Sequence, residues 1–230
     1  LPDWLKDSGA PSKVQHLVDY LKAHSTVEVL DLRPALVEAK QQRVTYLKTD
    51  THWNQFGGFV AYRALMQALA RQMPGLEPLP LDTYEWKPKP SPAGDLNRLK
   101  NTTDSAIEPH RLEAIPLKPL AELEKVYDPV RLPQKGIKDI WPFFTLNTNA
   151  SGRAMVFHDS FACSWYLLLG QHFKDVFYIW QYDWNRQLIE REKPDVVIDE
   201  MLERYVNQQD PAVLAQKDLA SETSDATASR

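Results

Sequence analysis

The chain has 230 residues, of which 27 are basic and 31 acidic, for a formal net charge of −4. The sequence has no polybasic block and no basic patch interleaved with aromatic residues, so the composition argues against nucleic acid as a partner. A single cysteine excludes an intrachain disulfide and a cysteine-based zinc site. No apolar run reaches the roughly 18 residues that a bilayer-spanning helix needs.

The first third of the chain alternates between helical and extended patterns. In order, these patterns predict a helix over 14–23, a strand over 27–32, an extended run over 43–50 and a helix over 54–73. Asn54 is the expected N-cap of the last helix. The sequence Asp50-Thr51-His52 therefore lies where an extended run gives way to a helix.

Residues 74–142 keep no lasting period of either kind and are punctuated by prolines. The whole chain has 17 prolines against eight glycines, together with seven tryptophans, which favours long ordered loops with aromatic surfaces. We interpret 74–142 as an ordered insertion around the site, with short antiparallel strands near 83–87 and 126–131.

Regular alternation of strands and helices resumes after the insertion. The patterns predict a strand over 153–160, a helix over 161–173, a strand over 175–180, a helix over 185–192 and a strand over 194–201. This order predicts an α/β fold with a parallel sheet flanked by helices. We expect one domain over 1–210 and a disordered tail over 211–230, which has little apolar content.

Two clusters of reactive side chains fall at expected strand ends, where the loops of a parallel sheet converge. One is Asp50-Thr51-His52, and the other is His158-Asp159-Ser160, which opens the next predicted helix. A serine on a strand-to-helix turn has the geometry of an acyl-transfer nucleophile, and an imidazole oriented by a carboxylate can take its proton. Together the clusters favour serine-based catalysis.

Each cluster also has a simpler interpretation. Asp50, Asp159 or Ser160 at the start of a helix can simply be a capping residue with no catalytic role. Metal binding is a further alternative, since Asp50, His52, His158 and Asp159 are all possible ligands. No pair among them has a spacing specific for a metal, so we predict no metal site.

The motifs resemble those of a known family. The segment YLKTDTHWNQFGGFVAYRALMQAL, beginning at Tyr46, resembles the signature of the AlgJ/AlgX group of polysaccharide O-acetyltransferases and their relatives with a D-x-H-W motif. VFHDSF followed by a helix is similar to the nucleophile block of that group, and GDLNRL and KPDVVIDEMLERY resemble further segments. The resemblance covers most of residues 46–205.

The resemblance implies an SGNH-hydrolase-like (flavodoxin-like) sheet with a circularly permuted motif order, because Asp-x-His precedes the serine in the chain. It also implies a serine-dependent O-acetyltransferase in which Ser160 is the nucleophile, His52 is its general base and Asp50 orients the base. Trp53, beside the base, is a candidate to stack on a sugar of the acceptor.

The oxyanion hole is harder to place from the sequence. We expect the backbone N–H of Ser160 as one donor, and a second donor either from the insertion over 74–142 or from a residue near Asn147 or Asn149.

The implied reaction moves acetyl groups onto hydroxyls of an exopolysaccharide such as alginate through an acetyl-serine intermediate. Alternatives are a carbohydrate acetylesterase with the same triad and a non-catalytic polysaccharide-binding or assembly subunit. Implied partners are the polysaccharide, an acetyl donor supplied by a membrane-bound O-acyltransferase, and other exopolysaccharide-assembly proteins, with no cofactor. The family works in the periplasm; the chain starts without a signal-like segment, so an export signal or anchor would lie outside it.

Overall fold

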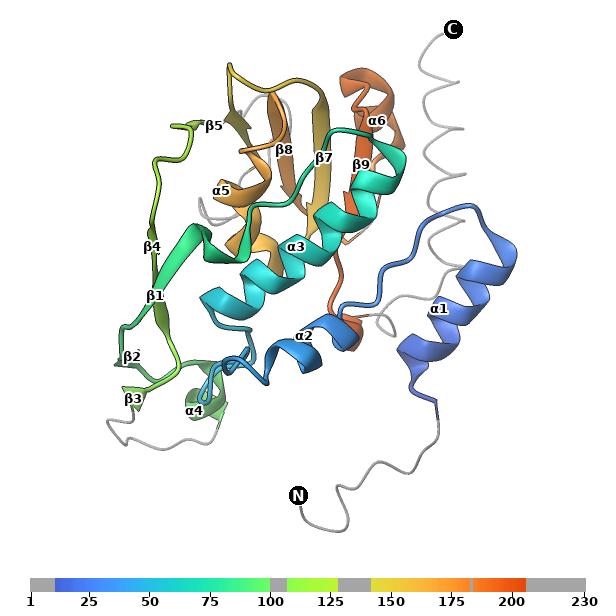
Figure 1. The fold of residues 1–230 in the computed structure, drawn as a ribbon. Helices are drawn as coiled ribbons and strands as arrows, with labels where there is room; N and C mark the ends of the chain where they lie inside the picture. Colours follow the sequence, from blue (N-terminus) through green and yellow to red (C-terminus); the bar gives the residue numbers. More distant parts are fainter. Residues whose placement is uncertain (1–10, 100–106, 128–141, 183, 206–230) are drawn as a thin grey trace, which may run out of the picture. The chain divides into compact units, whose positions relative to one another are not determined.

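The computed structural model describes residues 11–99, 107–127, 142–182 and 184–205 (Figure 1). The chain divides into two compact units. One is formed by Leu1–Asp31 with Leu202–Arg230, and the other by Leu32–Met201. The predicted tail over 211–230 lies outside the described residues. In the part of the chain that is described, no helix combines the length and apolar character that crossing a membrane requires.

The first unit contains helix α1 (Lys13–His24) and the short 3₁₀ helix η5 (Glu203–Tyr205). The hydroxyl of Ser12 accepts a hydrogen bond from the Gln15 N–H and caps α1. The helix predicted over 14–23 is therefore confirmed.

The second unit is built on a five-stranded sheet with the strand order β5-β6-β8-β7-β9. Its strands are β5 (Glu124–Tyr127), β6 (Phe143–Leu146), β7 (Arg153–His158), β8 (Asp175–Trp180) and β9 (Val196–Asp199). β7 pairs in parallel with both β8 and β9, whereas β6 is antiparallel to β8 and β5 is antiparallel to β6. The three strands that the alternating pattern predicts thus form the parallel part of a mixed sheet.

Helices complete this unit. They are α2 (Arg33–Ala39), α3 (Gln55–Gln72), α4 (Asp95–Leu99), α5 (Tyr166–Leu169) and α6 (Arg186–Glu192), with the 3₁₀ helices η2 (Leu81–Thr83) and η4 (Phe161–Trp165).

Side chains of β7 alternate between the two faces of the sheet. On one face Met155 and Phe157 form a core cluster with Leu188 of α6. On the other face the ring of His158 lies edge-on to Tyr166 of α5, with ring centroids 5.5 Å apart. The helices therefore cover both faces, and β7 is buried almost throughout.

Helix α3 begins directly after the first predicted cluster, and its first turns lie beside the segment that follows the second. In Figure 1 it crosses in front of the parallel strands, and it packs against η4 and α5. The Trp165 indole N–H donates to the Gly58 carbonyl at 3.0 Å. A Cβ on Gly57 would lie 2.0 Å from the Thr45 carbonyl oxygen, so glycine lets the start of α3 sit against the preceding loop.

The segment between α3 and β5 contains two small antiparallel ribbons as well as α4. β1 (Tyr84–Pro88) pairs with β4 (Leu112–Pro116), and β2 (Ser91–Pro92) pairs with β3 (Ile107–Glu108). The strand predicted near 83–87 is confirmed. The one predicted near 126–131 overlaps β5, which is an edge strand of the main sheet and no part of the ribbons.

Three local predictions are wrong. Residues 27–32 form no strand, because alternation alone supplies no neighbouring strand, and Val27 is 53% exposed. The run over 43–50 contributes only an isolated bridge between Tyr46 and Trp53, so it is a loop before α3 and no strand of the sheet. The helix predicted over 161–173 is split into η4 and α5, followed by a turn.

Candidate active site

Asp50 and His52 lie on a tight loop that folds back before α3. The Leu47 N–H donates to the His52 carbonyl at 3.1 Å, and the Asn54 N–H donates to the Thr45 carbonyl at 2.9 Å. The Asp50 carboxylate accepts the His52 N–H at 3.1 Å, an interaction typical of aspartate in turns. This bend brings the two side chains together, which an extended strand would not do.

The side chains of Asp50, His52 and Ser160 form a continuous hydrogen-bonded series. His52 Nδ1 lies 2.6 Å from Asp50 Oδ1, and His52 Nε2 lies 2.6 Å from Ser160 Oγ. An ionised carboxylate only accepts hydrogen bonds, so Nδ1 carries the hydrogen and Nε2 of the neutral ring is free to accept from the serine hydroxyl. The structure thus brings together the three residues predicted as catalytic, in the order base-orienting acid, base, nucleophile.

The carboxyl of Asp50 is poised as an anion. Burial alone would raise its pKa, but hydrogen bonds from the His52 side chain and backbone and from the Asp95 N–H lower the pKa below its ordinary value. The Asp50 side chain is 14% exposed and that of His52 is 30% exposed. The base is therefore accessible from solvent while its orienting acid is largely enclosed.

The capping interpretation fits neighbouring residues and not the proposed triad. Asn54 caps α3, accepting the Gly57 N–H at 2.9 Å. Asp159 accepts the Phe161 N–H at 2.8 Å at the start of η4. Ser160 occupies the N-cap position of η4, but its side chain makes no capping hydrogen bond and points to His52 instead.

The backbone around Ser160 leaves one N–H group available. The Asp159 N–H donates to the Glu200 carboxyl at 3.1 Å, and the Phe161 N–H is taken by Asp159. Among the described residues, the Ser160 N–H has no hydrogen-bond partner. It is therefore free to donate to an oxyanion formed beside its own hydroxyl, as expected from the sequence.

Of the two places expected for a second oxyanion donor, the one near Asn147 or Asn149 is wrong. The Asn147 side chain donates to the Gly170 carbonyl at 3.0 Å and accepts the Asn149 N–H at 3.0 Å. Its backbone N–H donates to Lys174, which directly precedes β8. These residues lie at the amino ends of the parallel strands, whereas Ser160 follows the carboxyl end of β7.

Trp53 packs against Phe161 and Trp165 rather than beside an open surface. The residue is 7% exposed, and its indole N–H donates to Ser164 Oγ at 3.0 Å. Its ring meets Phe161 edge-on at 5.0 Å between centroids and stacks on Trp165 at 5.6 Å, while Phe161 also lies 4.7 Å from the His52 ring. This burial argues against stacking of Trp53 on a sugar and indicates that it supports the imidazole.

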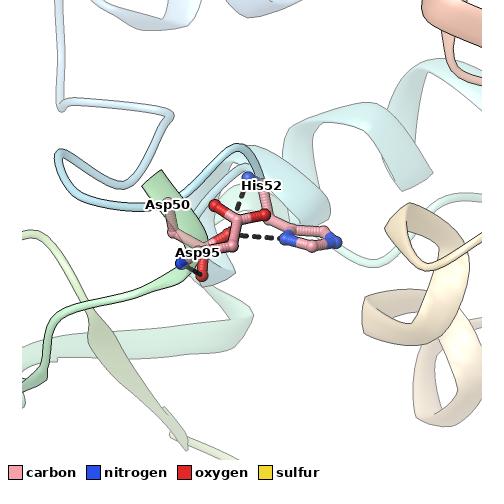
Figure 2. A group of neighbouring side chains, drawn as sticks. All are labelled: Asp50, His52 and Asp95. Carbon is pink, nitrogen blue, oxygen red and sulfur yellow. Dashed lines mark hydrogen bonds and ion pairs between the residues drawn. The ribbon is translucent and has the colours of Figure 1, made fainter. Parts of the chain in front are cut away.

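Asp95 lies beside Asp50 and His52 (Figure 2). One ligand atom from each of these three residues lies within 4.8 Å of the others, a spacing that could hold a metal ion. Hydrogen bonds already use these groups, because Asp95 accepts both the N–H and the hydroxyl of Thr51, at 2.8 and 2.6 Å. A metal bound by His52 would replace one of the two bonds that its ring makes, to Asp50 or to Ser160.

A second carboxylate fixes the other side of the same loop. Glu108 Oε2 accepts both the N–H and the hydroxyl of Thr49, each at 2.6 Å, and Oε1 accepts the His110 N–H at 2.7 Å. Glu108 is fully buried. Asp95 and Glu108 thus each hold one threonine of the loop by two bonds. Neither role could be predicted from the sequence, since carboxylates in an aperiodic segment carry no local signal of what they bind.

Comparison with known proteins places these residues in a family. Residues 2–126 match the family model described as SGNH hydrolase-like domain, acetyltransferase AlgX. The match contains Asp50 and His52 and ends before Ser160. A search of curated proteins gave no significant match.

Several solved structures are similar to this chain. PatB1 from Bacillus cereus superposes with a TM-score of 0.61 at 18% identity, covering 86% of this chain and 76% of PatB1. PatB1 with a sulfonyl adduct gives 0.60 at 18% identity, with coverages of 86% and 75%. A DHHW family protein from Eubacterium siraeum gives 0.57 at 15% identity, with 80% and 67%, and the O-acetyltransferase domain of Pseudomonas putida AlgJ gives 0.49 at 18%, with 90% and 74%.

The likeness to PatB1 and to the DHHW protein, at these identities, bears on the fold. It confirms the predicted α/β fold class, and the family match supplies the SGNH-hydrolase-like type. The match extends over more than half of the sequence. The chain therefore belongs to the AlgX family of SGNH hydrolase-like acetyltransferase domains.

Proposed function

We propose that the protein is a serine-dependent O-acetyltransferase that transfers acetyl groups to hydroxyls of an exopolysaccharide, alginate being one candidate. The observation that carries the proposal is the series Asp50–His52–Ser160, with both joining distances at 2.6 Å, in a chain of the AlgX family. The free N–H of Ser160 adds a donor where negative charge would develop.

The first half-reaction loads the enzyme. As Ser160 Oγ attacks the acetyl carbonyl carbon, its proton moves to His52 Nε2, and the carbonyl oxygen becomes an oxyanion that the Ser160 N–H stabilises. Asp50 steadies the imidazolium that forms. Collapse of the intermediate expels the donor's leaving group, which takes the proton from His52 and leaves acetyl-Ser160.

The second half-reaction transfers the acetyl group. A sugar hydroxyl gives its proton to His52 while its oxygen attacks the acetyl carbon, and Ser160 leaves and recovers the proton. With water as the attacking group the same steps release acetate, which is the esterase reaction. The partly exposed His52 ring leaves both acceptors able to reach the base.

We further propose, from the family, that the protein works in the periplasm with other exopolysaccharide-assembly proteins. In this proposal a membrane-bound O-acyltransferase supplies the acetyl group, and the domain needs no cofactor. These assignments concern the cell and are open to direct test by fractionation and co-purification.

Product analysis tests the reaction. The protein is incubated with a chromogenic acetyl ester and an oligosaccharide of defined length, alginate-derived or neutral, and the sugars are analysed by mass spectrometry. Acetylated sugar is the expected product, and it should be absent with Ser160→Ala. Release of acetate alone would favour the acetylesterase. No turnover with any ester, and equal labelling of wild type and Ser160→Ala by a sulfonyl fluoride, would favour a non-catalytic subunit.

A further inference from the structure

The turn that carries Ser160 is held by a carboxyl group that the proposed reaction does not use. Glu200 directly follows β9, and its N–H donates to the Phe157 carbonyl of β7 at 2.9 Å. Its side chain also reaches this segment, where Oε2 accepts the Asp159 N–H at 3.1 Å. Glu200 is therefore bonded to β7 through its backbone and to the serine turn through its side chain.

The same carboxyl contacts the turn on both sides of Ser160. Besides the Asp159 N–H, it lies close enough to the Asp159 carboxyl and to the Ala162 backbone to interact with both. With the Phe161 N–H taken by Asp159, the neighbouring N–H groups are occupied and that of Ser160 is not. Glu200 and Asp159 thus occupy the N–H groups on either side of Ser160 and leave that of Ser160 available.

Two carboxyl groups in hydrogen-bond contact cannot both ionise at low cost. Asp159 is fully buried. Burial and then the charge of Asp159 raise the pKa of Glu200 well above its ordinary value, which favours a proton bound to Glu200 and shared with Asp159.

The other titratable groups near the pair carry no charge that would replace this proton. Desolvation is the largest cause that raises the pKa values of Cys163 and Tyr166, and an ionised Glu200 would raise both further. Burial lowers the pKa of His158, whose Nδ1–H donates to the Asp159 carbonyl at 2.7 Å. All three are neutral at neutral pH.

We propose that Glu200 is a positioning residue whose protonated carboxyl fixes the turn from Asp159 to Ala162, so that the Ser160 hydroxyl faces His52 and the Ser160 N–H faces the oxyanion. Ionisation of Glu200 at alkaline pH places two carboxylates against each other and releases the turn. The role in catalysis rests on the proposed function, whereas the shared proton does not.

Glu200→Gln keeps the size of the side chain and removes its ionisable proton. Glutamine keeps a carbonyl for the Asp159 N–H and an amide N–H for the Asp159 carboxylate, but it does not ionise. We expect kcat on a chromogenic acetyl ester to stay within about threefold of wild type at neutral pH, and the alkaline fall of wild-type kcat to disappear.

Glu200→Ala should lower kcat about tenfold or more with little change in KM. Glu113→Gln, an exposed carboxylate in an ion pair with Lys89, is the control and should leave the profile unchanged.

A second readout needs no turnover. Because its pKa is raised in the folded state, Glu200 makes the wild type lose stability as the pH rises from the ordinary carboxyl pKa to the folded-state pKa. The free energy of unfolding is measured by chemical denaturation from pH 4 to 9, at about one point per pH unit. It should fall less steeply with pH for Glu200→Gln than for wild type or Glu113→Gln.

The two readouts separate the two proposals. If wild type and Glu200→Gln share the same alkaline limb, or the wild type has none, the positioning role is overturned. If the stability of wild type and of Glu200→Gln declines equally with pH, the inference that Glu200 and Asp159 share a proton is overturned. An enzyme inactive with every ester, but with the slope lost in Glu200→Gln, supports the shared proton while removing the proposed function.

Discussion

The two halves of the site are held by carboxyl groups of opposite character. The loop with Asp50 and His52 is fixed by Glu108, whose pKa burial alone would raise but which hydrogen bonds from Thr49 and from neighbouring backbone N–H groups bring below its ordinary value. The serine turn is fixed by Glu200, whose pKa is raised. One half therefore depends on an anion and the other on a retained proton, so acid should loosen the loop and alkali the turn.

The halves also differ in their scaffold. The serine turn follows β7 and is tied to the residue after β9, so it rests on the sheet. The acid–histidine loop lies outside the sheet and is held by α4 and by the β2–β3 ribbon. Substitutions under the loop should thus lower activity before they unfold the protein. The following four predictions probe the two halves, in order of decreasing effect.

Removing the groups that join the two halves should have the largest effect. Ser160→Ala and His52→Ala should each lower kcat by about a thousandfold or more, because the nucleophile or its base is gone. The double variant should be no worse than the single ones, since the residues act as a unit. If steady-state kinetics showed that the two losses in kcat multiply in the double variant, Ser160 and His52 would not act as a unit.

Crowding Asp50 should cost less. A Cβ on Gly94 would lie 2.1 Å from Asp50 Oδ2, so Gly94→Ala must displace the carboxylate that orients His52. We expect kcat to fall by about ten- to a hundredfold, as for small misplacements of catalytic groups. Gly75→Ala is the control: Gly75 has a φ of 98° and no atom near its Cβ position, so its substitution should lower stability and leave kcat unchanged. Equal kcat values for both variants would count against close contact at Asp50.

Glu108→Gln tests the anionic support of the loop. It leaves N–H donors of the loop facing an amide group and should destabilise the protein by about 1–3 kcal/mol at neutral pH, with a fall in kcat of about tenfold. A lowered pKa means that the wild-type contribution is present above the unfolded pKa and is lost as the pH falls through the folded one. The difference between the two proteins in chemical denaturation should therefore shrink in acid. A difference that is constant with pH, or matched by Glu113→Gln, would rule out this support.

Trp53→Phe should have the smallest effect. It removes the bond to Ser164 while keeping an aromatic ring on Phe161, so we expect a loss of about 1 kcal/mol and a kcat within severalfold of wild type. The KM for an oligosaccharide acceptor should not change. A large rise in that KM, with kcat unchanged, would restore the predicted contact with sugar.

The residues predicted to be catalytic could be found from the sequence because each belongs to a short motif at the start of a helix. The distance of 2.6 Å between His52 Nε2 and Ser160 Oγ depends on the packing of α3 against η4, which no local sequence pattern predicts. Glu108 and Glu200 escaped prediction for the same reason, since each binds a backbone N–H far away in the sequence. Residues 27–32 show the opposite case, because they have the alternating pattern of a strand but no neighbouring strand to pair with.

The most direct test of the central claim is to trap the acetyl-enzyme. The protein is mixed with a chromogenic acetyl ester, quenched in acid within the first turnover, digested and analysed by mass spectrometry. We expect one acetyl group on the peptide that contains Ser160 and none on the same peptide of Ser160→Ala. The acetyl group should disappear when an oligosaccharide acceptor is added before the quench. Full turnover in Ser160→Ala, or acetyl transfer without any modification of this peptide, would contradict the central claim.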